Sequence, residues 1–252
     1  MNNFIRTLFL IIFFVSCSTE NAPDCIQLAG TTIQKEVPVT SFEEIIVYER
    51  VKLFIEQGET LQVLIETGEN LMNEISVNVD NNRLSIRNGN TCNLFRKYEI
   101  TKVYVTVPNL KWLQNSSGSA VESIGTLKFP TLHLVSENQA KDLSIHTDGD
   151  FIFDLDVVNL RITNDNYSNY FLKGKVENFN GFFAAGDGRL EAANLIVQHY
   201  DLFHRGTNKL IINPQQSLRG NIYSHGDIIS KNRPPVVNVT EHYRGRLIFE
   251  AP

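Results

Sequence analysis

Four carboxylates, Asp148, Asp150, Asp154 and Asp156, lie close together near the middle of the chain. Asp154 and Asp156 are two positions apart, so on a strand they would point to the same face, about 7 Å from each other. Such a pair could act as acid and base in glycoside chemistry or as oxygen ligands for Ca²⁺. A solvated strand face beside a turn explains the same residues, and it is the preferred interpretation because the Gly-rich acidic repeat of a calcium site is absent.

Aromatic residues gather in the same part of the chain and suggest a ligand surface. Exposed rings could stack on sugar rings or contact a protein partner. Phe182 and Phe183 are adjacent, so one of them would point outward from a strand. Burial within the fold is the alternative explanation for most of these rings. The candidate surface consists of Tyr167, Tyr170, Phe171, Phe182 and Phe183.

The first cysteine, Cys17, predicts a lipid anchor. A basic start and a short apolar run, Leu8 to Val15, precede Ser16, as in a secretory signal. The triplet Val15-Ser16-Cys17 resembles the end of a bacterial lipobox. This resemblance implies cleavage after residue 16 and attachment of the protein to a membrane through lipid on Cys17, with an ordinary signal peptide as the alternative. Residues 1–16 are then the lipoprotein signal peptide and residues 17–35 the lipidated N-terminus and tether.

The other two cysteines, Cys25 and Cys92, predict a disulfide, because an exported chain meets an oxidising compartment. Two unpaired, buried thiols are the alternative. The cysteines lack a Cys-x-x-Cys pattern or a nearby histidine pair, so no metal site is expected. No sequence pattern indicates a cofactor.

Charge and composition limit the class of partner. The chain has 252 residues, is 42% hydrophobic and carries a formal net charge of -5. A packed core is therefore feasible, whereas binding to a nucleic acid is not expected, because a phosphate backbone requires clustered Lys and Arg.

Period-2 alternation dominates the chain and predicts an all-β protein. In residues 36–107, apolar residues alternate with polar ones between Gly, Asn and Asp turns, as in Val103, Val105 and Val107. Residues 108–252 repeat a looser theme about every 20 residues, which indicates a β-helix or β-solenoid of short stacked rungs. One continuous solenoid and two stacked parts with a break near residues 88–97 both fit. The predicted rungs are Leu110–Pro130, Thr131–Asp150, Phe151–Gly174, Val176–Ala193, Leu195–Pro214 and Leu218–Pro235, with tight polar turns at 116–119, 137–140, 164–167, 186–188, 205–208 and 224–227.

Several of these landmarks resemble the auto-transporter adhesin head GIN domain family, a β-helical group of unknown function common in Bacteroidetes. The similar segments are Phe42-x-x-Ile45-x-Val47, Ile55 to Gly58, Glu69 to Leu71, Val107 to Leu110, the corner Ser116 to Ser119, and Gly220 to Ile228. The resemblance implies the fold and a location in the cell envelope, and it brings no catalytic residues.

Together these observations predict a lipoprotein anchored in the outer membrane, facing either the periplasm or the cell surface. The expected role is non-catalytic, either adhesion and binding of a glycan or protein or a structural role. The alternative hypothesis is a carbohydrate-active enzyme that acts on polysaccharide through Asp154 and Asp156.

Overall fold

The computed structural model describes residues 27–90, 92, 97, 99–138 and 140–250, and they form one sheet of 18 strands with a single short 3₁₀ helix. No helix in this part of the chain is long and apolar enough to cross a membrane. The elements are β1 (Thr32–Glu36), β2 (Glu44–Tyr48), β3 (Lys52–Gln57), β4 (Gln62–Gly68), η3 (Glu69–Glu74), β5 (Ile75–Asp80), β6 (Arg83–Asn88), β7 (Lys102–Val107), β8 (Trp112–Ser116), β9 (Val121–Leu127), β10 (Thr131–Ser136), β11 (Phe151–Asn166), β12 (Tyr170–Gly186), β13 (Leu190–His204), β14 (Leu210–Ile212), β15 (Pro214–Ile222), β16 (Ile228–Ser230), β17 (Val236–Glu241) and β18 (Leu247–Phe249).

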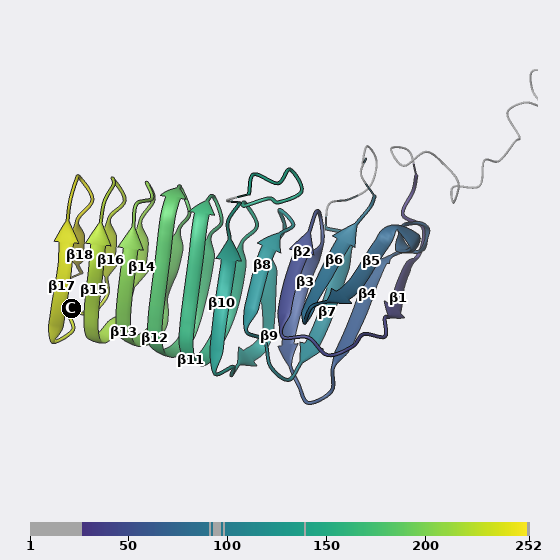
Figure 1. Cartoon of the computed structure of the whole chain (residues 1–252), viewed down its shortest axis with the longest axis horizontal. Coiled ribbons are helices and arrows are strands. Elements are labelled where there is room, and N and C mark those ends of the chain that lie inside the picture. Colours follow the sequence, from purple (N-terminus) through teal and green to yellow (C-terminus); the bar gives the residue numbers. More distant parts are fainter. Residues whose placement is uncertain (1–26, 91, 93–96, 98, 139, 251–252) are drawn as a thin grey trace, which may run out of the picture.

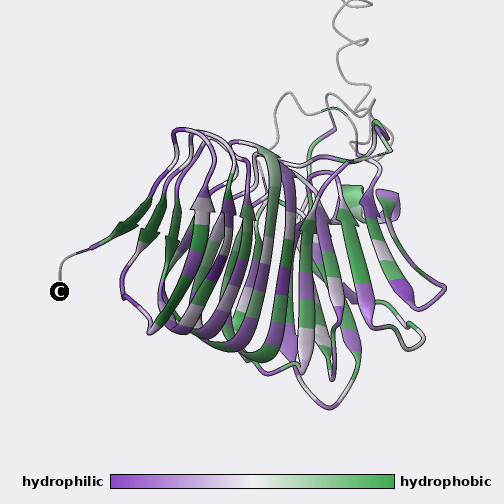
Figure 2. Ribbon diagram, turned by 60° about the vertical axis from the view of Figure 1, so that its left-hand side comes forward, coloured by the Kyte–Doolittle hydropathy of each residue, from purple (hydrophilic) through white to green (hydrophobic). Residues whose placement is uncertain are grey.

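The sheet folds into two layers that enclose the core (Figures 1 and 2). Layer A contains, in hydrogen-bonded order, β1, β4, β7, β3, β9, the first halves of β11, β12 and β13, then β14, β16 and β18. Layer B contains β5, β6, β2, β8, β10, the second halves of β11, β12 and β13, then β15 and β17. The all-β solenoid prediction is confirmed, and the sheet runs without a break across the described residues.

Alternation of side chains along each strand builds the core. In layer A, a buried column runs through Phe151, Tyr170, Leu190, Leu210 and Ile228, each directly beside the next in the parallel register. In layer B, Leu160, Phe179, Tyr200 and Leu218 form a second such column. Since a single rung leaves its apolar face open, each rung depends on its neighbours for burial.

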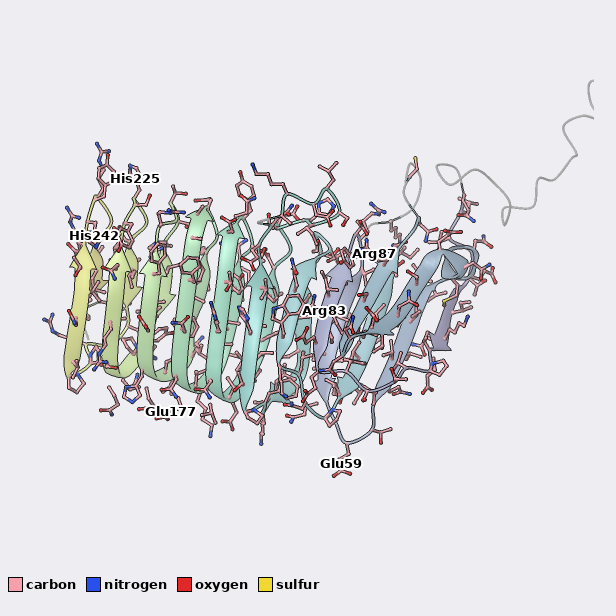
Figure 3. The ribbon with its side chains drawn as sticks, viewed as in Figure 1. Glu59, Arg83, Arg87, Glu177, His225 and His242 are labelled. Atoms are coloured by element: carbon pink, nitrogen blue, oxygen red, sulfur yellow. The ribbon has the colours of Figure 1, made fainter. Side chains whose placement is uncertain are left out.

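The rungs have two different edges. At the bend edge, β11, β12 and β13 curve from layer A into layer B without interruption, whereas at the turn edge short loops return the chain to layer A (Figure 2). Glu177 lies at the bend edge, and His225 and His242 lie at the turn edge (Figure 3). Gly186 begins one turn with a φ of 78°, and a Cβ there would lie 2.4 Å from the Asn166 carbonyl oxygen, so the corner excludes a larger residue.

Several predicted rung boundaries are wrong. The hydrogen-bonded register starts successive rungs at Phe151, Tyr170, Leu190, Leu210 and Ile228, whereas three of the predicted rungs began at Val176, Leu195 and Leu218. The reason is that β11, β12 and β13 each cross the bend as one long strand. The apolar run before the bend and the apolar run after it therefore belong to the same rung.

Sequence order and spatial order also differ near the N-terminal end of the stack. The pair β2 and β3 lies between β6 and β7 on one side and β8 and β9 on the other. Beyond β6 and β7, the antiparallel strands β4, β5 and β1 close this end, and η3 buries Leu71 and Met72 there. Antiparallel strands end the parallel stack because they cannot serve as templates for a further identical rung.

Candidate functional site

The five aromatic residues of the predicted ligand surface do not form one surface. Tyr170 and Phe183 are 0% and 1% exposed and meet edge to face in the core, with their ring centroids 5.9 Å apart. Including these two rings in a ligand surface was wrong. Tyr170 lies in phase with buried Leu172, and Phe183 lies in phase with buried Phe179. Tyr167 is exposed at the turn edge, while Phe171 and Phe182 lie on the outer surfaces of opposite layers.

Phe182 belongs to a stacked aromatic column on layer B. Phe182 stacks on Phe203 at 4.6 Å, Phe203 contacts Tyr223 at 4.9 Å, and Tyr223 stacks on His242 at 4.2 Å between ring centroids. Along the column, each ring thus covers part of a face of its neighbour. A sugar or a protein side chain cannot stack on a face that is already covered, so this column stabilises the sheet and is a poor ligand platform.

Phe171 presents an uncovered ring within a groove on the outer surface of layer A. The groove has a volume of about 550 Å³. Its floor includes Phe171 and Ile152, which are directly paired in the register and are 42% and 41% exposed. Among the described residues, no aromatic ring stacks on Phe171.

Two bulges create this groove. Glu122 on β9 pairs with Ile152 on β11, and Thr126 pairs with Asp154. Two extra residues are therefore inserted on β9 between these pairs. On β13, one extra residue is inserted opposite the step from Phe171 to Lys173. Gly125 accommodates the first bulge with a φ of 70° in open space. The two bulges flank β11 and β12, and residues of both bulges, Gly125 and Asn194, line the groove.

The rim of the groove is polar. The carboxylate of Asp154 lies 3.3 Å from the Lys173 ammonium, and the Asp154 backbone N–H donates to Ser123 Oγ at 3.0 Å. Glu191 and Asn194 complete the rim from β13, and Glu191 is paired with Arg189. The groove therefore combines an apolar floor with carboxylate, ammonium and amide groups, as is typical of small-molecule sites.

Asp154 and Asp156 each form an ion pair with a lysine of the neighbouring strand, and both separations are 3.3 Å. A general acid must carry a proton, whereas an ion pair with lysine requires the ionised carboxylate. The pairs match the cross-strand charge pairing that stabilises sheets. Within the described part of the chain, no three His, Cys, Asp or Glu side chains converge as a metal site would require.

Sequence reasoning singled out Asp154 and Phe171 but missed the partners that complete the groove. Ile152, Ser123, Glu191 and Asn194 carry no motif, and only the glycine inside the strand-like stretch around Gly125 hints at a bulge. Among the predicted cysteine sites, Cys17 and Cys25 lie outside the described residues, and Cys92 is disulfide-bonded. The pairing of Cys25 with Cys92 and the lipid on Cys17 stay predictions.

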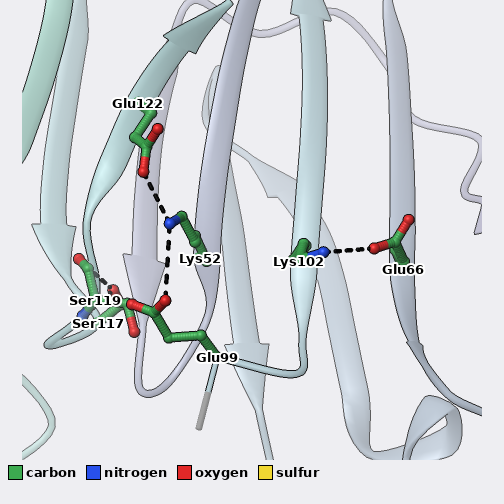
Figure 4. Close-up of polar contacts among 7 residues, drawn as sticks. All are labelled: Lys52, Glu66, Glu99, Lys102, Ser117, Ser119 and Glu122. Carbon is green, nitrogen blue, oxygen red and sulfur yellow. Dashed lines mark hydrogen bonds and ion pairs between the residues drawn. The ribbon is translucent and has the colours of Figure 1, made fainter. Parts of the chain in front are cut away.

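Elsewhere on layer A, charged side chains pair with one another. Lys52 lies 2.8 Å from Glu122 and 3.7 Å from Glu99, and Lys102 lies 2.9 Å from Glu66 (Figure 4). The hydrogen bond from Lys52 to Glu122 raises the pKa of this lysine. These charges neutralise one another on the outer surface of β3, β4 and β7, so this part of the layer offers less to a ligand than the groove does.

Two histidines of layer B are held neutral. His204 is completely buried and donates from Nε2 to the Asn208 carbonyl oxygen at 3.0 Å, and burial lowers its pKa to about 4. Burial, with a smaller effect of Arg161, also lowers the pKa of His133 to about 4. Both residues belong to the packed sheet and lie on the layer opposite the groove.

A family model described as "Putative auto-transporter adhesin, head GIN domain" matches residues 41–234. The chain belongs to this family. The matched range extends from just before β2 to just before β17 and includes both bulged strands of the groove. A search of curated proteins finds no match to the chain.

Solved structures share the fold at low sequence identity. A putative adhesin from Bacteroides fragilis is 17% identical with a TM-score of 0.71, and the alignment covers 87% of this chain and 97% of that chain. A putative lipid binding protein from Parabacteroides distasonis is 18% identical with a TM-score of 0.65, covering 88% and 98%. A putative adhesin from Parabacteroides merdae is 19% identical with a TM-score of 0.57, covering 88% and 97%. At these identities the likeness shows the fold alone.

Proposed function

We propose that this head GIN domain protein is a lipid-anchored adhesin of the cell envelope that binds a glycan in the groove between the bulges of β9 and β13. The observation that carries the proposal is the open ring of Phe171 on the groove floor, surrounded by carboxylate and amide groups. The family description as an adhesin supports a role in binding. The proposed activity is binding without turnover.

The groove chemistry suits a sugar ring. The apolar face of a pyranose can stack on an aromatic ring, while its hydroxyls need hydrogen-bond acceptors and donors at the edge. Phe171 and Ile152 supply the apolar floor, Asp154 and Glu191 supply acceptors, and Asn194 supplies both a donor and an acceptor. The groove lies on the outer surface of layer A and has a volume of about 550 Å³, which suits one unit of a longer polymer.

The predicted anchor is compatible with this use of the groove. Gln27, the first described residue, donates from its side chain to the Asn70 carbonyl oxygen at 3.0 Å, so the chain enters the domain beside η3, at the closed end of the stack. A lipid on Cys17 would place this closed end toward the membrane. The groove on β9, β11, β12 and β13 would then face sideways, away from the bilayer surface, where a polymer can reach it.

Glycan binding by the purified protein tests the proposal. Phe171→Ala is expected to weaken binding of an envelope or host glycan at least tenfold, which corresponds to about 1.4 kcal/mol. Tyr167→Ala is the matched control, because Tyr167 is an exposed ring in the turn just before this rung and lies outside the groove. Equal binding by the Phe171→Ala variant and the parent protein would contradict the proposed site.

Reducing-end release separates binding from catalysis. The parent protein is expected to bind the glycan and release no new reducing ends over long incubation. Release of reducing ends that is lost in Asp154→Asn would instead establish the enzyme alternative.

Protease treatment of intact cells tests the location. If the protein is surface-exposed, the protease removes it and spares a periplasmic control, and glycans outside the cell become the ligands to screen. Protection equal to that of the control would place the groove in the periplasm and contradict adhesion to external surfaces.

A further inference from the structure

A second groove lies on the outer surface of layer B, just beyond the bend edge. It has a volume of about 520 Å³ and is lined mainly by residues of β11, β12, β13 and β15. One outward-facing row crosses it, in which Arg161, Asn180, Asp201 and Arg219 pair in direct register on these four neighbouring strands. All four residues are exposed. We call this site the arginine groove, because an arginine stands at each end of the row with shorter side chains between.

The two arginines of this groove carry charges that nothing neutralises. Among the described residues, neither Arg161 nor Arg219 has an ion-pair or hydrogen-bond partner, whereas Arg83 and Arg87 of the same layer each pair with a glutamate and lie over an aromatic ring. The arginines on the strands of layer B that lack a partner are therefore the two that line the groove. An unpaired guanidinium presents a fork of N–H donors that matches an anion with two oxygens.

The charges in the groove are sparse. Arg161 and Arg219 contribute two positive charges and Asp201 contributes one negative charge, while Glu177, at the bend edge, is not part of the lining (Figure 3). With neighbouring strands about 4.8 Å apart, the Cα atoms of the two arginines are separated by about 14 Å. A nucleic acid, with one charge about every 1.7 Å of duplex axis, is too densely charged for this row. The spacing favours a polymer with isolated negative groups.

Neutral polar groups complete the lining. The Asn178 side-chain amide donates to Asn159 Oδ1 at 3.1 Å, and His199 Nδ1 lies 2.9 Å from Ser217 Oγ. These contacts orient the side chains and leave Asn178 Oδ1, Asn159 Nδ2 and His199 Nε2 without a partner among the described residues. Sugar hydroxyls both donate and accept hydrogen bonds, so amide and imidazole groups suit them.

A bulge on β15 borders the arginine groove. Val197 on β13 pairs with Pro214 on β15, and His199 pairs with Ser217, so β15 has one extra residue between these pairs. The bulge ends at Ser217, whose buried side chain holds the exposed His199 ring. Bulges often re-aim side chains at binding sites, and this one sets the register between the His199 and Ser217 pair and the arginine row.

We propose that the arginine groove binds an acidic polysaccharide, with the guanidinium groups of Arg161 and Arg219 binding uronic acid carboxylates. Each guanidinium donates two parallel N–H bonds to one carboxylate. The amides between the arginines bind hydroxyls of the intervening sugar, and Asp201 accepts from a hydroxyl while disfavouring a second anion close to the first. This site lies on the layer opposite the groove that contains Phe171 and does not depend on glycan binding there.

Binding of polygalacturonate to the purified full chain tests the ligand class. The control ligand is the carboxyl-reduced polymer, which has the same backbone and no charge. We expect the reduced polymer to bind about tenfold more weakly or worse, because it offers no partner to either guanidinium. Equal binding of the two polymers would overturn the proposal. Binding of dextran sulfate in preference to polygalacturonate would overturn the assignment to a carboxylate.

Glutamine variants of the arginines locate the site. Arg161→Gln and Arg219→Gln should each weaken polygalacturonate binding about tenfold. Arg83→Gln is the matched control, because it removes the same charge from the same row of layer B outside the groove. Equal weakening by all three variants would show that only net charge matters, and it would overturn the site.

Asp201→Asn should change binding in the opposite direction. Removal of this carboxylate leaves the two arginines unopposed, so polygalacturonate should bind more tightly. Weaker binding would contradict an anionic ligand. Phe171→Ala should bind polygalacturonate as the parent chain does, so failure of the arginine groove and failure of the groove on layer A are distinguishable. The arginine and aspartate positions are exposed, and circular dichroism checks that each variant is folded.

Discussion

Tyr170 and Phe171 are neighbours in sequence with opposite environments, and their alanine variants should separate the core from the groove. Tyr170 is completely buried, stacks on Phe151 with ring centroids 4.8 Å apart, and lies with its hydroxyl 3.3 Å from Asn164 Oδ1. Truncating a buried aromatic residue typically costs about 3–5 kcal/mol, and the stacked partner raises the expected loss within that range. We therefore expect Tyr170→Ala to lower the free energy of unfolding by about 4 kcal/mol.

Phe171→Ala should cost much less. Its ring is 42% exposed, and water can fill the space that the ring leaves, so no sealed cavity forms. A loss of about 1 kcal/mol is expected. With a urea m-value of about 3 kcal/mol/M, the unfolding midpoint would fall by roughly 1 M or more for Tyr170→Ala and by about 0.3 M for Phe171→Ala.

Urea unfolding followed by circular dichroism measures both variants under the same conditions. Similar midpoints for the two variants would refute the assignment of Tyr170 to the core and of Phe171 to the surface. A fall in m-value for either variant would indicate that the stack unfolds in parts, and the two midpoints would then be compared at the same transition.

Two further perturbations test other parts of the fold. The pKa of His204 is lowered to about 4 in the folded protein from a usual value of 6.5, so its contribution to stability is present above pH 6.5 and is lost as the pH falls toward 4. That loss amounts to about 3 kcal/mol. Thermal unfolding at pH 7 and pH 4.5 should show that His204→Gln loses less stability on acidification than the parent protein. Equal losses would contradict the pH-dependent contribution of His204 to stability. Gly174 has a φ of 105°, and an added Cβ would lie 2.0 Å from the Leu155 carbonyl oxygen, whereas Gly125 has open space around it. Gly174→Ala should therefore lower the melting temperature much more than Gly125→Ala, and equal effects would show that the bend tolerates a side chain.

The class of fold follows from local signals that the sequence carries strongly. Alternation in stretches such as Val103, Val105 and Val107 predicts half-buried strands, and the corners at 116–119 and 186–188 are turns in the structure. These features depend on neighbouring residues only, so one sequence is enough to predict them. The family resemblance rests on the same landmarks, and the family match confirms it.

Strand phase distinguishes the core aromatics from the surface ones. Tyr170 is in phase with Leu172 and Val176, which are apolar, while Phe171 is in phase with Lys173 and Lys175. The alternation of side chains along a strand is therefore sufficient to predict Tyr170 inward and Phe171 outward. Grouping the five rings into one ligand surface was wrong because neighbouring rings on one strand point to opposite faces.

The remaining errors concern interactions between distant segments. Strand β2 lies between β6 and β8, so Glu44 pairs with Arg83 and with Trp112, which are 39 and 68 positions away in the sequence. No local pattern specifies that choice. The bulges on β9 and β13 are likewise defined only against their partner strands. Because the groove exists only where those registers shift, its complete set of lining residues could not be derived from the sequence.

The groove lies where two bulges interrupt the regular repeat of the rungs. Within regular rungs, inward side chains contact their equivalents above and below, and outward charges such as Asp156 and Lys175 pair across strands. A surface built this way satisfies its own contacts and offers little to a ligand. At the two bulges the register shifts on both sides of β11 and β12, and the Phe171 ring lies 42% exposed between them, beside Ile152 and Glu191. Binding should therefore be sought first in the groove between the bulges, where this regular pairing is interrupted.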